Sequence, residues 1–116
     1  MNWPNDADGD GDVLRRLESD NFDFNIARTI DFNIDFNSWP LSSENKKSLN
    51  TLYPNCVFID PDEEDIKNGD INGYIQFSIK DKLTYNLVIE TQKETTEKTK
   101  QFGGWCESWG VSHNNT

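Results

Sequence analysis

The clearest pattern in the chain is a strict alternation of apolar and polar residues from Thr29 to Phe36. Because neighbouring side chains of a β-strand point to opposite faces, this segment predicts a strand with two unlike sides. The two sides are Ile30, Phe32, Ile34 and Phe36 against Asp31, Asn33 and Asp35. Unpaired carboxylates do not tolerate burial, so the polar side should face solvent. We expect this strand in the interior of a sheet that helices cover on one side only.

Three shorter segments also have the pattern of strands, namely Cys56 to Ile59, Tyr74 to Ile79 and Trp105 to Val111. The second of these places Ile75, Phe77 and Ile79 inward. The third would carry Trp105, Glu107 and Trp109 on one side and Cys106, Ser108 and Gly110 on the other. The segment from Asp62 to Gly73 is interpreted as a long loop. The two strands that it connects, Cys56 to Ile59 and Tyr74 to Ile79, should therefore pair as an antiparallel hairpin.

Three helices are expected between and before these strands. The first runs from about Gly11 to Asp20, with an apolar stripe of Val13, Leu14 and Leu17. The second starts after a cap at Ser42 or Ser43 and ends before Pro54, with Leu49, Leu52 and Tyr53 inward. The third spans Thr84 to Phe102, with an inward face of Val88, Thr91, Thr95, Thr99 and Phe102.

The order of the expected elements is a leading helix followed by strand, helix, strand, strand, helix and strand. This order is the split β-α-β unit of a ferredoxin-like α+β fold. It predicts a four-stranded antiparallel sheet with two helices on one face, preceded by an extra N-terminal helix. We interpret residues 1–116 as one domain with a flexible acidic lead (1–10) and a frayed tail (112–116).

The charge balance narrows the class of partner. Eleven basic residues oppose twenty-one acidic ones, so the formal net charge is −10. Such a field repels nucleic acid directly and attracts a basic protein. Neither a run of about 20 apolar residues nor a signal peptide is recognisable, so we expect a cytoplasmic protein without a membrane partner. A monomer or weak homodimer is expected.

The aspartates near the N-terminus suggest a second, minor interpretation. An EF-hand loop beginning at Asp6 would match at Asp8, Asp10 and Gly11, but its twelfth position is Leu17 where a bidentate Glu is needed. Calcium binding therefore stays a minor alternative to a flexible segment whose last aspartate, Asp12, caps the first helix.

Catalysis has little support in the sequence. The single histidine, His113, lies in the tail, and Cys56 and Cys106 lack metal-ligand spacing and are interpreted as small buried hydrophobic residues. No nucleophile elbow or phosphate loop is present. We therefore expect neither an enzyme nor a cofactor.

Carboxylates and tryptophans are instead the candidates for contact with a partner. The candidate residues are Asp31 and Asp35 on the central strand, Asp62, Glu63, Glu64 and Asp65 in the acidic loop, and Trp105, Glu107 and Trp109 on the last strand. An ordinary solvated sheet face remains the alternative for the polar side of the sheet, because outward polar residues need no functional reason.

Four segments resemble the RraB family, regulators of ribonuclease E. They are Asp8-Gly9-Asp10 with Val13-Leu14-Arg15-Arg16-Leu17, Thr29-Ile30-Asp31-Phe32, Leu83-Thr84-Tyr85, and Gly104-Trp105-Cys106-Glu107-Ser108-Trp109-Gly110. The resemblance implies a small acidic α+β protein that binds a ribonuclease and restrains it without catalysing a reaction. The alternative is an immunity protein that neutralises a nuclease toxin through the same charge complementarity.

Overall fold

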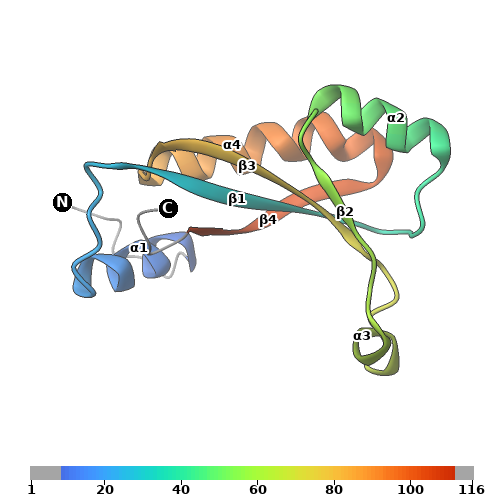
Figure 1. The fold of residues 1–116 in the computed structure, drawn as a ribbon, viewed down its shortest axis with the longest axis horizontal. Coiled ribbons are helices and arrows are strands. Elements are labelled where there is room, and N and C mark those ends of the chain that lie inside the picture. The colour runs from blue at the N-terminus through green and yellow to red at the C-terminus, as the bar shows by residue number, and fades with distance from the viewer. Residues whose placement is uncertain (1–8, 112–116) are drawn as a thin grey trace.

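The computed structural model describes residues 9–111 and has an α+β fold (Figure 1). Its elements are α1 (Gly9–Ser19), β1 (Ala27–Phe36), α2 (Ser43–Leu52), β2 (Val57–Ile59), α3 (Glu63–Lys67), β3 (Tyr74–Lys82), α4 (Tyr85–Thr99), a 3-10 turn (Lys100–Phe102) and β4 (Gly104–Val111). All of the strands belong to one four-stranded sheet.

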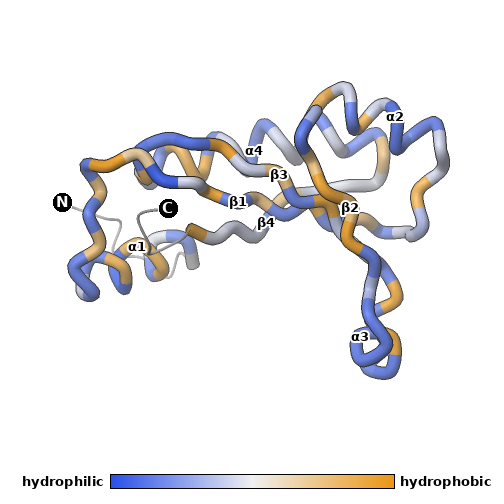
Figure 2. The backbone as a smooth tube through the Cα atoms, viewed as in Figure 1, coloured by the Kyte–Doolittle hydropathy of each residue, from blue (hydrophilic) through white to orange (hydrophobic). Residues whose placement is uncertain are grey.

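The strands lie in the order β2-β3-β1-β4, and every neighbouring pair is antiparallel. The expected interior position of β1 is confirmed, because β3 and β4 flank it. In the register of β1 with β3, Phe32 lies opposite Phe77 and Ile34 opposite Ile75. Facing residues point to the same side of an antiparallel pair, so the apolar sides of these strands coincide. The alternation along β1 is visible as changing colour in Figure 2.

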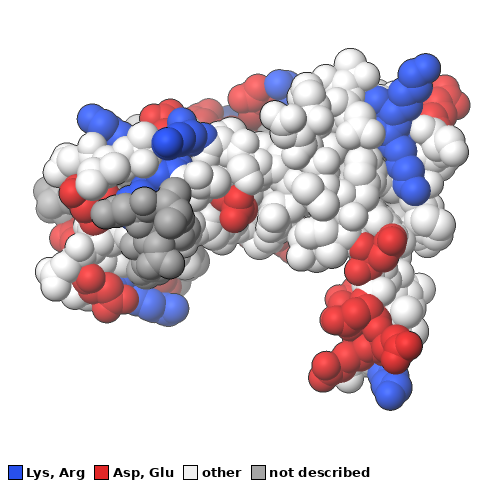
Figure 3. Space-filling model, viewed as in Figure 1, with Lys and Arg blue, Asp and Glu red and all other residues white. Residues whose placement is uncertain are grey.

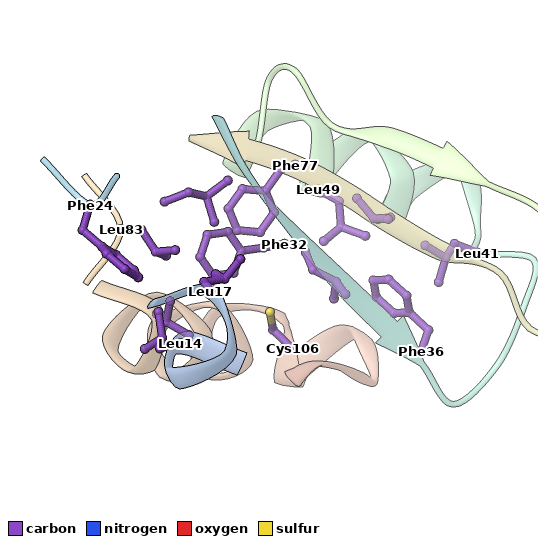
Figure 4. Close-up of a cluster of buried hydrophobic side chains, with 14 residues drawn as sticks. Leu14, Leu17, Phe24, Phe32, Phe36, Leu41, Leu49, Phe77, Leu83 and Cys106 are labelled. Atoms are coloured by element: carbon purple, nitrogen blue, oxygen red, sulfur yellow. The ribbon is translucent and has the colours of Figure 1, made fainter. Parts of the chain in front are cut away.

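The core lies between this apolar side and the helices (Figure 4). Ile30, Phe32 and Ile34 are fully buried. Each long helix adds to the same cluster: Leu14 and Leu17 come from α1, Leu49 from α2 and Val88 from α4. The two-sided character predicted for β1 is therefore confirmed.

Three details of the helices differ from expectation. Val13 is 36% exposed and Leu52 is 41% exposed, so neither belongs to the buried stripe. Val13 lies beside the buried line that Leu14 and Leu17 form at a three-residue spacing, and Leu52 is the last residue of α2. Asp12 is not a cap, because α1 already begins at Gly9.

Helix α4 is shorter than predicted and buries a different set of side chains. It is capped by Thr84, whose side chain accepts a hydrogen bond from the Leu87 amide at 3.0 Å, and it ends at Thr99. The 3-10 turn follows, and Gly103 with φ 77° ends it in the left-handed region. Val88, Thr95 and Thr99 are buried as expected, together with Gln92 in place of Thr91.

The segment from Asp62 to Gly73 is not only a loop, because it contains the short helix α3. Asp62 accepts from the Asp65 amide at 2.7 Å, and Asp65 accepts from the Asp62 amide at 3.1 Å, which is a capping box. Residues 60–73, which we name the acidic arm, project from the body of the domain (Figure 1). At the base of the arm, the Trp39 indole donates to Asp60 at 2.8 Å.

Strand β4 contains an irregularity that its sequence pattern did not predict. In its register with β1, Ile34 lies opposite Cys106 but Asn33 lies opposite Ser108, so Glu107 is an extra residue. A bulge of this kind reverses the sides on which later residues point. Trp105 lies opposite Asp35 on the polar side, whereas Trp109 lies opposite Phe32 on the helix side. The prediction that Trp105, Glu107 and Trp109 share one side is wrong.

Candidate protein-binding site

The polar side of the sheet, which we name the open face, is held together by hydrogen bonds between side chains of neighbouring strands. Asn33 donates to Ser108 at 3.2 Å and accepts from Gln76 at 3.1 Å. Ser78 donates to Asp31. Helix α1 turns Leu14 and Leu17 into the core, on the opposite side of the sheet. The polar residues of the open face therefore satisfy each other, and Asp31 already has a partner within the domain.

A cavity of about 250 Å³ lies where the acidic arm joins the open face, and we name it the corner pocket. Its walls include three carboxylates and two aromatic side chains: Asp35, Asp70, Glu107, Tyr74 and Trp105. Tyr74 and Trp105 both lie directly opposite Asp35, one on β3 and one on β4. The pocket therefore contains an aromatic residue on each side of a central carboxylate.

Different elements position the three carboxylates. Asp35 is near the end of β1, Glu107 is the extra residue of the β4 bulge, and Asp70 comes from the acidic arm. The arm is tied down close by, because the Asn72 amide donates to the Phe36 carbonyl at 3.2 Å. Gly73 allows the close approach of the arm to the body, since a Cβ there would lie 2.2 Å from the Ile59 carbonyl oxygen.

The carboxylates of the corner pocket repel one another. Partial burial raises the pKa of Asp35 above its usual value of 3.8, and the charges of Glu107 and Asp70 raise it further. Within residues 9–111 the ion pairs are Arg15 with Asp12 and Lys98 with Glu94, and neither reaches this pocket. The pocket is therefore a concentration of negative charge that no lysine or arginine of the described chain neutralises.

The acidic arm adds a second group of negative charge (Figure 3). Asp62 and Asp65 use part of their hydrogen-bonding capacity in the capping box of α3, whereas Glu63 and Glu64 are exposed and have no such bonds in the described part of the chain. The four predicted residues are thus the N-cap (Asp62) and the first three residues (Glu63, Glu64 and Asp65) of one short helix. None of these four residues lines the corner pocket. The acidic arm contributes Asp70 to that pocket instead.

Trp109, although predicted as a contact residue, has a partner inside the domain. Its indole donates to Asp10 of α1 at 2.8 Å, and the Gln92 amide donates to the other Asp10 oxygen at 2.9 Å. This side chain packs against the core and is not part of the open face. The structure brings together Asp35, Trp105 and Glu107 of the predicted contact residues.

Asp70 and Tyr74, which line the corner pocket, were not among the predicted contact residues. Tyr74 could have been predicted, because alternate residues of a strand point to the same face and Tyr74 alternates with Gln76 and Ser78, which were expected on the polar side. Asp70 carried no comparable signal. Its position depends on how the arm folds back, which no local pattern determines.

The calcium interpretation does not agree with the structure. Asp10 and Asp12 lie in helix α1, so the segment from Gly9 onward cannot form an EF-hand loop. Asp6 and Asp8 lie outside the described residues, as does His113. No cluster of three potential metal ligands occurs within residues 9–111.

The two thiols do not form a reactive site. Burial raises the pKa of Cys106 to about 12, and partial burial also raises the pKa of Cys56. A thiol with a raised pKa is protonated at neutral pH and is a weak nucleophile. Both cysteines are free. Cys106 is buried as expected, whereas Cys56 is only partly buried, so the expectation of a buried residue is wrong for Cys56.

A second cavity, of about 330 Å³, lies on the helix side between α2, β3 and α4. Tyr53, Phe77 and Thr95 are among its walls, and Lys98 and Glu94 line it as an ion pair.

No helix of residues 9–111 has the length and apolar character that a membrane crossing requires.

The fold and the site define an acidic α+β domain whose open sheet face presents a negatively charged pocket with aromatic walls. The chain belongs to the RraB family, described as regulator of ribonuclease activity B, whose sequence profile matches residues 7–111. None of the curated proteins matches the chain. The family resemblance seen in the sequence is confirmed.

Proposed function

We propose that this protein binds a ribonuclease in the cytoplasm and restrains its activity, without catalysing a reaction itself. The family is one of regulators of ribonuclease activity, which supports a protein partner of this kind. The observation that carries the proposal is the corner pocket, where Asp35, Asp70 and Glu107 gather without a basic neighbour in the described chain. A basic surface of the ribonuclease supplies the missing positive charge.

The distribution of charge supports two separate roles for the acidic residues. Glu63 and Glu64 stand on the projecting arm, where they attract a basic partner from a distance. Asp35 and Glu107 lie in a pocket, where contact removes water and the charges act at short range. The arm therefore contributes mainly to the association rate, and the pocket mainly to the lifetime of the complex.

We also assign the sheet to the ferredoxin-like class as part of this proposal. The order β2-β3-β1-β4 and the placement of α2 after β1 and α4 after β3 support the assignment. In such an arrangement both crossover helices lie on one side of the sheet. That leaves the other side free to receive a protein.

The experiment is a cleavage assay with purified ribonuclease E and a fluorogenic RNA, combined with association kinetics at about 50 and 200 mM salt. The wild-type protein should slow cleavage, and its association rate should fall as salt rises. The double variant Asp35→Asn, Glu107→Gln should restrain cleavage at least several-fold less well. Glu90→Gln, Glu97→Gln is the matched control, because it removes the same charge from exposed positions of α4.

Unchanged cleavage with no measurable complex would overturn the proposal. Association that is indifferent to salt would reject the electrostatic mechanism while leaving the partner intact. Cleavage of RNA by the purified protein alone would contradict its non-catalytic role.

A further inference from the structure

The aromatic residues of the corner pocket form a row across three strands. Tyr74 on β3 and Trp105 on β4 are both paired with Asp35 on β1, so the three side chains point to the same side of the sheet. Neighbouring strands lie about 4.8 Å apart, which puts the Tyr74 and Trp105 backbones about 10 Å apart across β1. Rings that project from backbones at this separation can take one flat group between them, above the carboxylate.

The charge of the pocket selects the kind of flat group that can enter. Asp35, on the central strand, lines the cavity together with Asp70 and Glu107. No hydrogen bond or ion pair engages these carboxylate groups within residues 9–111. A nucleobase could stack on the two rings, but its phosphates would meet these charges, so a planar cation fits better than a nucleotide.

A guanidinium group has all of the required properties. It is planar, permanently charged, able to stack on aromatic rings, and able to form paired hydrogen bonds to a carboxylate. An ammonium group carries the charge but cannot stack as a plane. The absence of a three-ligand cluster among the described residues argues against a metal ion as the occupant.

We propose that the corner pocket binds the guanidinium group of one arginine side chain presented by the partner protein, with Tyr74 and Trp105 as its walls and Asp35 as its principal carboxylate. This inference rests on the proposed function, because it identifies the chemistry through which the ribonuclease is held. A bound cation also reduces the repulsion among the three carboxylates. Its charge therefore lowers the pKa of Asp35 from the raised value of the free protein.

The test is an NMR titration of the full chain with three capped tripeptides that differ only in the central residue: arginine, lysine or citrulline. Citrulline is the neutral analogue of nearly the same shape. The Trp105 indole N–H signal, assigned by its loss in Trp105→Leu, should shift and saturate with the arginine peptide. Binding of the lysine peptide should be about 3-fold to 10-fold weaker, and the citrulline peptide should cause no saturable shift. The Trp109 indole, on the other side of the sheet, is the internal control.

Two variants show whether the response comes from the pocket. Asp35→Asn keeps the shape of the side chain and should weaken arginine binding about 10-fold, whereas Asp31→Asn, at a neighbouring position of the open face, should leave it nearly unchanged. An unshifted Trp109 signal in both variants shows that the fold is intact. Equal shifts by citrulline and arginine, or full binding by Asp35→Asn, would overturn the inference.

Uridine monophosphate provides the opposite test. A saturable shift of the Trp105 signal with this nucleotide, stronger than with the arginine peptide, would replace the inference with nucleotide binding.

The proposed function is tested separately, by measuring complex formation with ribonuclease E. If the ribonuclease binds Trp105→Leu and Asp35→Asn as tightly as wild type, the arginine pocket is wrong and the function stands. If the ribonuclease does not bind wild type, the function fails whatever the peptides do.

Discussion

The indole of Trp109 donates a hydrogen bond of 2.8 Å to Asp10, which joins the last strand to the first helix across nearly the whole length of the sequence. Asp10 accepts a second bond from Gln92 of α4 through its other oxygen. One carboxylate therefore fastens α1, α4 and β4 to each other. Two of the segments that resemble the RraB family, the one around Asp10 and the one around Trp109, meet at this point.

Removing this carboxylate should destabilise the domain. Asp10→Ala leaves the Trp109 and Gln92 donors without their acceptor, and we expect a loss of about 2 kcal/mol in the free energy of unfolding. Trp109→Phe removes only one of these two hydrogen bonds, so the part of its destabilisation that comes from hydrogen bonding should be smaller than in Asp10→Ala. It also removes packed apolar surface, which adds to the loss. Urea denaturation of both single variants and the double variant measures the coupling. Fully additive losses would mean that the two residues do not act together.

The bulge at Glu107 predicts opposite behaviour for two tryptophans of one strand. Trp109→Leu should lower stability and leave ribonuclease binding per folded molecule unchanged, because its side chain faces the helices. Trp105→Leu should lower binding several-fold with little effect on stability, because it lines the corner pocket. Chemical denaturation and binding kinetics on the same two variants make the comparison. A loss of stability in Trp105→Leu as large as that in Trp109→Leu would contradict the assignment of sides.

The sequence predicts best where a single strand or helix carries its own signal. The alternation from Thr29 to Phe36 located β1 and its buried side, because burial of one face forces a period of two. The interior position of β1 also followed from the order of the elements along the chain. The side of Trp109 could not be predicted, since a bulge is a property of the pairing between β4 and β1 and leaves no mark in β4 alone. Helix α3 was predictable in principle from Asp62 and Asp65, three residues apart as in a capping box. That Asp70 and Asp35 line the same pocket could not be predicted, because it depends on how the acidic arm folds back against the sheet.

The packing of β1 gives a direct stability prediction. Phe32 is fully buried and stacks on Phe77 with ring centroids 5.5 Å apart, so Phe32→Ala should lower the free energy of unfolding by about 3 to 5 kcal/mol. Asp31→Asn should change it by less than about 0.5 kcal/mol, because Asn can still accept the bond from Ser78. Thermal and urea denaturation measure both. Similar losses from the two substitutions would contradict the facing of the strand.

The acidic arm allows charge and structure to be separated. Glu63→Gln, Glu64→Gln removes charge but leaves the capping box, so the association rate with the ribonuclease should fall and α3 should stay folded. Asp62→Ala removes the cap that accepts from the Asp65 amide, at a cost of about 1 kcal/mol to this local structure. Hydrogen exchange at the Asp65 and Ile66 amides should then quicken only in Asp62→Ala. Quickened exchange in the glutamate variant as well would show that charge itself holds the arm.

The raised pKa of Asp35 predicts how stability depends on pH. Burial is the largest cause, followed by the charges of Glu107 and Asp70, and all three favour the protonated carboxyl in the folded state. The contribution of Asp35 to stability is therefore fully present below its usual pKa of 3.8 and is lost as pH rises through the raised value. Asp35→Asn should accordingly stabilise the domain slightly at about pH 7 and have no such effect at about pH 3. Thermal denaturation at both values checks this.

The cause of that shift can be tested in the same way. Glu107→Gln removes one of the two repelling charges, so the pKa of Asp35 should move part of the way back toward its usual value but not reach it, because burial remains. A carboxyl carbon titration by NMR in wild type and Glu107→Gln measures the difference. A wild-type Asp35 that titrates at or below the usual value would mean that positive charge already reaches the pocket in the free protein, and the electrostatic basis for binding a cation there would be lost.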